Sequence, residues 1–71
     1  MKRYAVGVCH FDEDNTVKIV EAEDELFAMV KAVGNQEEWR INENELPFKT
    51  VDEGITFYLQ GDVAVSVPVE I

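Results

Sequence analysis

A strict alternation near the start of the chain constrains the fold more than any other feature. Residues 3–11 alternate with the two-residue period of a β-strand. One side carries Tyr4, Val6, Val8 and His10, and the other carries Ala5, Gly7, Cys9 and Phe11. Both sides are partly apolar, which is typical of a strand inside a sheet. We expect Gly7 to leave room for a bulky neighbour such as a crossing helix.

A turn, a second strand and a helix follow. Residues 12–15 are polar with turn chemistry and residues 16–20 are β-branched again, so the first two runs predict a hairpin. From Asp24 to Val33 the apolar residues recur at helical spacing. Acidic residues 23–25 suit the positive end of the helix dipole, and Gly34 followed by Asn35 supplies the stop.

The middle of the chain, residues 36–54, leaves two alternatives open. Trp39 and Ile41 alternate with polar residues over too short a stretch to separate a strand from one helical turn. Pro47 ends any helix before it, and residues 52–54 have turn chemistry.

Residues 55–59 and 63–71 predict two further strands that form a second hairpin. The preferred register gives one continuous apolar face, with the pairs Leu59–Val63, Phe57–Val65 and Ile55–Val67. Pro68 cannot donate to a ladder, which indicates that the last strand lies at an edge or that its pairing ends there.

These elements predict an α+β fold in two layers. An antiparallel sheet of about four strands carries one helix on one face, in the order β-β-α-β-β. We expect residues 1–71 to form a single domain, close to the lower size at which a core holds without disulfides or metals.

The chain is strongly acidic, with 15 Asp and Glu against 6 Lys and Arg and a formal net charge of −9. Such a surface is repelled by anionic lipid and by nucleic-acid phosphate, so we expect direct binding to neither. No apolar run approaches the roughly 18 residues of a membrane span. A single cysteine and no leader resembling a signal peptide predict a cytoplasmic protein.

Motifs for a metal, a cofactor or catalysis are weak. The spacing of a calcium-binding loop is matched by Asp12, Asp14, Thr16 and Glu23. Val17, however, stands where that motif needs Gly, so a solvated turn is the better interpretation. Cys9 and His10 are adjacent and would point to opposite faces of a strand, so they cannot share a metal. We predict neither a cofactor nor an enzymatic activity.

The acidic residues gather in patches at the first turn, at the helix start and along the middle segment. A compact negative surface resembles duplex phosphate and would be attracted to a basic groove of another protein, whereas the alternative is a merely soluble acidic protein. Trp39, Phe48 and Tyr58 are either interface anchors or core residues. The predicted partner-binding residues are Asp12, Glu13, Asp14, Glu21, Glu23, Glu37, Glu38, Trp39, Glu43 and Glu45.

The opening segment, MKRYAVGVCHFDEDNTVKIVEAEDELFAMVKAVG, runs a short strand pair straight into a helix. In style, this half of the chain resembles the small accessory proteins of tailed bacteriophages. The resemblance implies an inhibitor that binds a host enzyme or a bacterial defence protein, and several acidic proteins of that kind act as DNA mimics.

Two functional hypotheses follow. The first is a phage-encoded binding protein that occupies a basic surface of a bacterial nucleic-acid-handling or defence protein. The second is a self-associating assembly module, a homodimer in which the strand at residues 63–71 pairs across a symmetry axis. Capture of a small ligand between protomers ranks last, because the chain has few Arg and Lys residues to hold phosphate.

Overall fold

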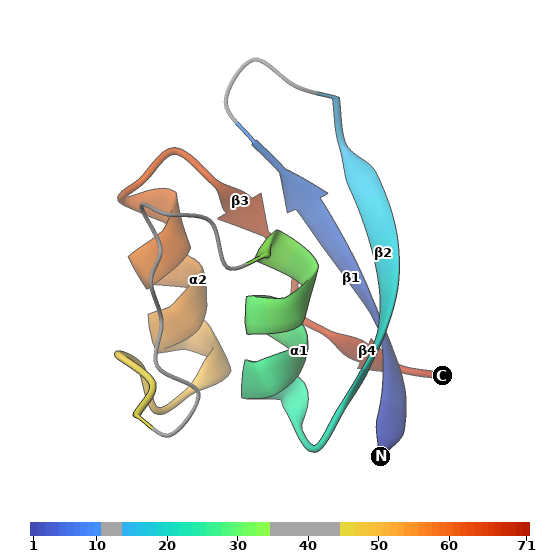
Figure 1. Ribbon diagram of the computed structural model, residues 1–71. Helices are drawn as coiled ribbons and strands as arrows, with labels where there is room; N and C mark the ends of the chain where they lie inside the picture. Colours follow the sequence, from blue (N-terminus) through green and yellow to red (C-terminus); the bar gives the residue numbers. More distant parts are fainter. Residues whose placement is uncertain (11–13, 35–44) are drawn as a thin grey trace.

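The computed structural model describes residues 1–10, 14–34 and 45–71. Along the chain it contains β1 (Lys2–Cys9), β2 (Thr16–Ala22), α1 (Glu25–Val33), α2 (Val51–Leu59), β3 (Ala64–Val65) and β4 (Val69–Glu70). The four strands form one antiparallel sheet, and both helices lie on the same side of it (Figure 1). The predicted α+β fold is confirmed, with two helices in the described ranges where the sequence predicted one.

Strand β1 lies inside the sheet, as its alternation predicted. It pairs with the whole of β2 on one edge, whereas β3 and β4 share the other edge. Tyr4, Val6 and Val8 are buried beneath the helices, and Ala5 and Gly7 are half-buried on the opposite face. The alternation therefore marks a strand that is covered on one face only.

Helix α1 begins and ends where the sequence predicted. The Oδ1 atom of Asp24 accepts a hydrogen bond of 3.0 Å from the backbone N–H of Phe27, which caps the first turn. At the other end Gly34 adopts φ 88°, and its N–H donates to the Val30 carbonyl at 3.0 Å. This helix packs on β1, β2 and α2, and five of its residues are buried: Ala28, Met29, Val30, Ala32 and Val33.

The strand predicted at residues 55–59 is wrong, because these residues belong to helix α2. Thr50 caps the helix by accepting a hydrogen bond of 3.2 Å from the Glu53 N–H, so residues 52–54 lie inside the first turns of the helix and not in an isolated turn. Tyr58 is fully buried, although the predicted strand pattern placed it opposite the apolar face. Of the ambiguous segment, residues 35–44 lie outside the described residues.

The predicted second hairpin is therefore wrong as well. Residues 60–62 connect α2 directly to the last strand, and the Val63 N–H donates to the Tyr58 carbonyl at 3.1 Å. Val63 and Val65 are buried. They form no strand pair with residues 55–59, because β3 pairs with β1.

A β-bulge interrupts the C-terminal strand between β3 and β4. Between the pairs Val8–Val65 and Ala5–Val69, β1 has two residues and the C-terminal strand has three, of which the last is Pro68. The position of this proline at an interruption of an edge strand confirms the prediction. Because one extra residue reverses which side chains face the core, Val65 is buried whereas Val67 is exposed.

Gly7 lies against this bulge, and not beneath a helix as the sequence analysis expected. A Cβ atom at Gly7 would lie 3.2 Å from the Oγ atom of Ser66 and 3.4 Å from its Cβ atom. The small residue is therefore explained by the close approach of the neighbouring strand.

Candidate interaction surfaces

Four of the ten predicted partner-binding residues are described by the structure, and all four are exposed: Asp14, Glu21, Glu23 and Glu45. Asp14 precedes β2 and Glu23 follows it, so the seven-residue strand between them separates the two by about 23 Å or more. Thr16 and Glu23 are separated in the same way, which prevents them from holding one calcium ion. The remaining predicted residues, Asp12, Glu13, Glu37, Glu38, Trp39 and Glu43, lie outside the described residues.

A second group of acidic residues is explained by the helices. Both helices begin at the same end of the molecule, the lower end in Figure 1. Asp24 and Glu25 lie at the start of α1, and Asp52 and Glu53 lie in the first turn of α2. Negative charge there is favoured by the helix dipole, so these four carboxylates stabilise the fold.

Within the described ranges, the carboxylates have few cationic partners. One ion pair joins two side chains in this part of the chain, Lys2 and Glu70, with Nζ 3.8 Å from Oε1. Ten acidic residues are described and all are exposed: Asp14, Glu21, Glu23, Asp24, Glu25, Glu45, Asp52, Glu53, Asp62 and Glu70. The acidic surface is therefore open to solvent and to other molecules.

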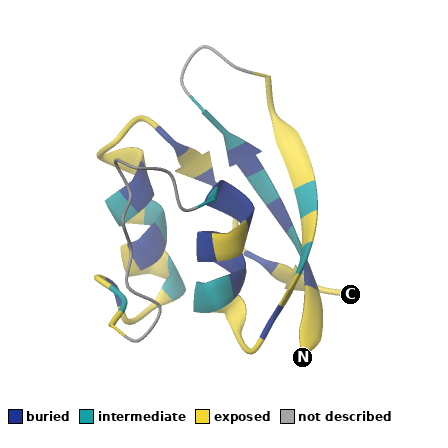
Figure 2. Cartoon of the chain, in the orientation of Figure 1, coloured by how far each residue is buried: buried dark blue, intermediate teal, exposed yellow. Residues whose placement is uncertain are grey.

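The face of the sheet that points away from the helices is apolar. Figure 2 shows much of β2 as exposed, in contrast to the alternation along β1. Across this face, Ile19 pairs with Ala5 and Ala5 pairs with Val69. Large apolar residues that are 51–70% exposed lie on β2 and along the C-terminal segment that contains β3 and β4, to either side of β1: Val17, Ile19, Val67, Val69 and Ile71. We call these five residues and the small residues Ala5 and Gly7 between them the open sheet face.

The open sheet face is a trough with two raised sides. Ala5 and Gly7 of the central strand are small, whereas β-branched residues stand on the strands about 5 Å to either side. At one end the trough deepens into a hollow of about 340 Å³, whose lining includes Gly7, Cys9, Ala64 and Ser66. The net charge of this face is low, because its acidic strand residue Glu21 has the basic residue Arg3 as its cross-strand neighbour.

No protein-family model, curated protein or solved structure matches this chain. A function is therefore inferred from the surfaces themselves. Neither of the two helices in the described part of the chain has the length and apolar character needed to cross a membrane.

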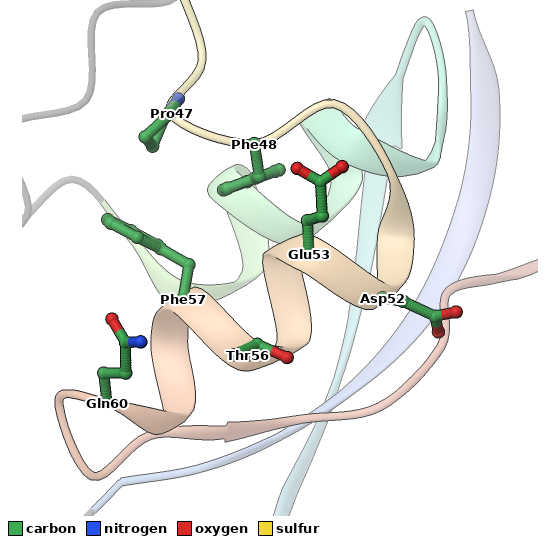
Figure 3. Close-up of a pocket in the computed structure, with 7 residues that line it drawn as sticks. All are labelled: Pro47, Phe48, Asp52, Glu53, Thr56, Phe57 and Gln60. Atoms are coloured by element: carbon green, nitrogen blue, oxygen red, sulfur yellow. The ribbon is translucent and has the colours of Figure 1, made fainter.

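A second hollow, of about 350 Å³, lies beside α2 (Figure 3). Pro47 and Phe48 form one side, and Asp52, Glu53, Thr56, Phe57 and Gln60 of the helix form the other. Phe48 is buried and is part of an aromatic cluster, with its ring centroid 5.7 Å from that of Phe57 and 5.9 Å from that of Tyr58. Of the two alternatives for Phe48 and Tyr58, core packing is therefore the one the structure supports.

The remaining candidates for chemistry are Cys9 and the side chains that could hold a metal ion. Cys9 faces the open sheet face, and its thiol donates a weak hydrogen bond to the His10 carbonyl at 3.7 Å. Across the residues that the structure describes, no three His, Cys, Asp or Glu side chains are grouped in a way that could hold a metal ion.

The open sheet face was not predicted from the sequence. Val17 and Ile19 alternate with Lys18 and Val20, which was a usable signal that both sides of β2 are partly apolar. For the C-terminal strand the signal was misleading. The bulge reverses the pattern after Ser66, so Val67 does not continue the buried side of Val63 and Val65.

Proposed function

We propose that this protein is a binding module that acts by protein–protein contact through its open sheet face. The observation that carries the proposal is the contiguity of five exposed, β-branched side chains on one face: Val17, Ile19, Val67, Val69 and Ile71. Scattered apolar residues on a surface need no explanation, whereas a contiguous patch marks an interaction site.

The energetic argument follows from burial. Full burial of a Val or Ile side chain contributes about 1.5–3 kcal/mol relative to its exposed state. Five such side chains can supply a central apolar contact even after the entropy lost on association is subtracted. The half-buried Ala5 and Gly7 add shape to the contact, because a partner side chain can enter the trough between the raised sides.

Matched charge substitutions test the proposal. Ile19→Lys lies on the open sheet face, whereas Leu59→Lys lies on α2; the two native side chains are similarly exposed, at 51% and 58%. Both variants change the net charge equally. The immobilised wild type is used to retain proteins from a bacterial lysate, including further copies of the chain. We expect the immobilised Ile19→Lys variant to lose these proteins and the immobilised Leu59→Lys variant to keep them. Equal retention by both variants would contradict the proposal.

A second candidate is the acidic inhibitor implied by the bacteriophage resemblance, which would occupy a basic surface of a bacterial nucleic-acid-handling or defence protein. The exposure of all ten described carboxylates favours it. Attraction between opposite charges is screened by salt. A partner held in this way is therefore released as salt is raised, whereas one held by the open sheet face remains bound.

A further inference from the structure

We propose that the occupant of the open sheet face is a second copy of this chain, so that two sheets pack face to face in a symmetric dimer. The inference rests on the proposed function and names its partner. In this arrangement β4 of each copy lies over the trough of the other, with Val69 set against Ala5. The helices then form the two outer layers of a four-layer assembly.

Shape is the first argument for a second copy. The face has a raised side on β2, a trough on β1 and a raised side on the C-terminal strand. Shifting a second copy by one strand spacing, about 5 Å, brings a raised side of each copy into the trough of the other. A two-fold axis satisfies both contacts at once, because the same patch serves on both subunits. The hollow of about 340 Å³ at the end of the trough gives further room for an entering side chain.

Charge is the second argument. The protein as a whole carries −9, so association with a copy of itself is least unfavourable where charge is lowest. Glu21 is the one acidic residue among the described strand positions of this face, and its cross-strand neighbour is Arg3. A surface evolved for a basic partner would carry carboxylates around its apolar centre. Of the ten described carboxylates, those of Asp24, Glu25, Asp52 and Glu53 lie at the helix starts, and that of Glu70 on β4 pairs with Lys2, whereas Asp14 and Glu23 lie at the two ends of β2.

Area is the third argument. The protein exposes 4834 Å² in total, and a stable interface usually takes about 800 Å² from each partner, so a specific dimer needs about one sixth of this surface. The open sheet face, which extends over β2, β1 and the C-terminal strand, is the face that has to supply it.

Sedimentation equilibrium on the full chain tests the proposal, over protein concentrations from about 1 µM to about 500 µM. We expect the mass to rise from 8.1 kDa to twice that value. We also expect the dimer to tighten when NaCl is raised from about 0.05 M to about 0.5 M, because salt screens the repulsion between two acidic copies. Binding to a basic partner would weaken over the same range.

Val69→Lys is the decisive variant, since it lowers the net negative charge of each copy, so that a weaker dimer cannot result from greater overall repulsion between two acidic copies. We expect its dissociation constant to rise by at least about tenfold, and that of Leu59→Lys to stay within about twofold of wild type. Ile71→Lys serves as the second variant if the circular dichroism of Val69→Lys shows loss of the fold.

A monomer at every concentration and salt, or a dimer that both face variants leave intact, would overturn the inference. The proposed function would survive the first result if Ile19→Lys still abolished the binding of another protein. It would fail with the inference only if substitutions on the face had no effect on any association.

Discussion

Ser66 and Gly7 exchange two hydrogen bonds across the bulge that divides the C-terminal strand. The backbone N–H of Gly7 donates to the Oγ atom of Ser66 at 2.8 Å, and the backbone N–H of Ser66 donates to the Gly7 carbonyl at 2.9 Å. The serine hydroxyl thus replaces the carbonyl that a regular ladder would present to Gly7. The bulge is held by a specific side chain, which keeps Val67 and Val69 on the open sheet face.

Ser66→Ala should therefore destabilise the protein by about 1 kcal/mol, because the N–H of Gly7 loses its acceptor. Urea unfolding followed by circular dichroism measures the difference. Thr56→Ala, an exposed hydroxyl on α2, is the control and should change stability by a few tenths of a kcal/mol at most.

Gly7→Ala completes a double-mutant cycle with this change. In the wild-type background the new Cβ atom would be 3.2 Å from the Ser66 Oγ atom, so it should destabilise the protein. In the Ser66→Ala background that contact is gone and the same substitution should cost less. Additive effects would show that the two residues do not act on one contact.

A second close approach joins the two helices at Gly54. A Cβ atom there would lie 2.9 Å from the Cε atom of Met29 and 3.1 Å from two ring atoms of Phe48. Alanine gains up to about 1 kcal/mol in helix propensity, but overpacking a core costs about 1–3 kcal/mol. The methionine tip can move, whereas the Phe48 ring is held against Phe57 and Tyr58.

We therefore expect Gly54→Ala to lower the free energy of unfolding by about 1 kcal/mol, again measured by urea unfolding. The control is Thr56→Ala on the same helix, where the side chain is exposed and the substitution only removes atoms. A Gly54→Ala protein as stable as this control would mean that the helices separate at little cost.

The cap of α2 gives a further prediction. Thr50→Ala removes the acceptor of the Glu53 N–H and should cost about 1 kcal/mol, whereas Thr50→Ser keeps the hydroxyl and most of the stability. Thermal unfolding of the two variants compares them directly. Equal losses in both would assign the effect to the threonine methyl group and not to the cap.

A comparison of α1 with α2 explains why the first half of the fold was predictable from the sequence and the second half was not. In the first half, Asp24 and Gly34 bound the apolar period of α1, and the alternation of β1 has no competing interpretation. In the second half, Thr50 and Glu53 have the Thr-x-x-Glu spacing of a helix start, but the alternation of Ile55, Phe57 and Leu59 predicts a strand over the residues that follow. A nine-residue helix has so few turns that the helical spacing of its apolar residues is not clearly distinguishable from the alternation of a strand.

The open sheet face was hidden for a different reason. An exposed Val or Ile has the same sequence pattern as a buried one, and only the tertiary structure decides which side the helices cover. The bulge at Ser66 adds a one-residue shift that periodicity cannot locate in advance. The positions of Val67 and Val69 therefore became clear only from their register with β1.

Tyr58 gives the last prediction, which concerns pH. Its side chain is fully buried, and burial raises the pKa of its hydroxyl from 10.0 to about 12. The unfolded chain releases this proton near pH 10, whereas the folded chain holds it to about pH 12. The contribution of the neutral hydroxyl is thus fully present below pH 10 and is lost as pH rises through 12, by about 3 kcal/mol in total.

Unfolding in urea at pH 9, 10 and 11 should show this loss in the wild type, and Tyr58→Phe should show a smaller one because the titrating group is gone. The difference between the two proteins removes the contributions of the other groups that titrate in this range. Parallel dependence on pH in both proteins would mean that the Tyr58 hydroxyl ionises without unfolding, through an opening of the core between α2 and the sheet.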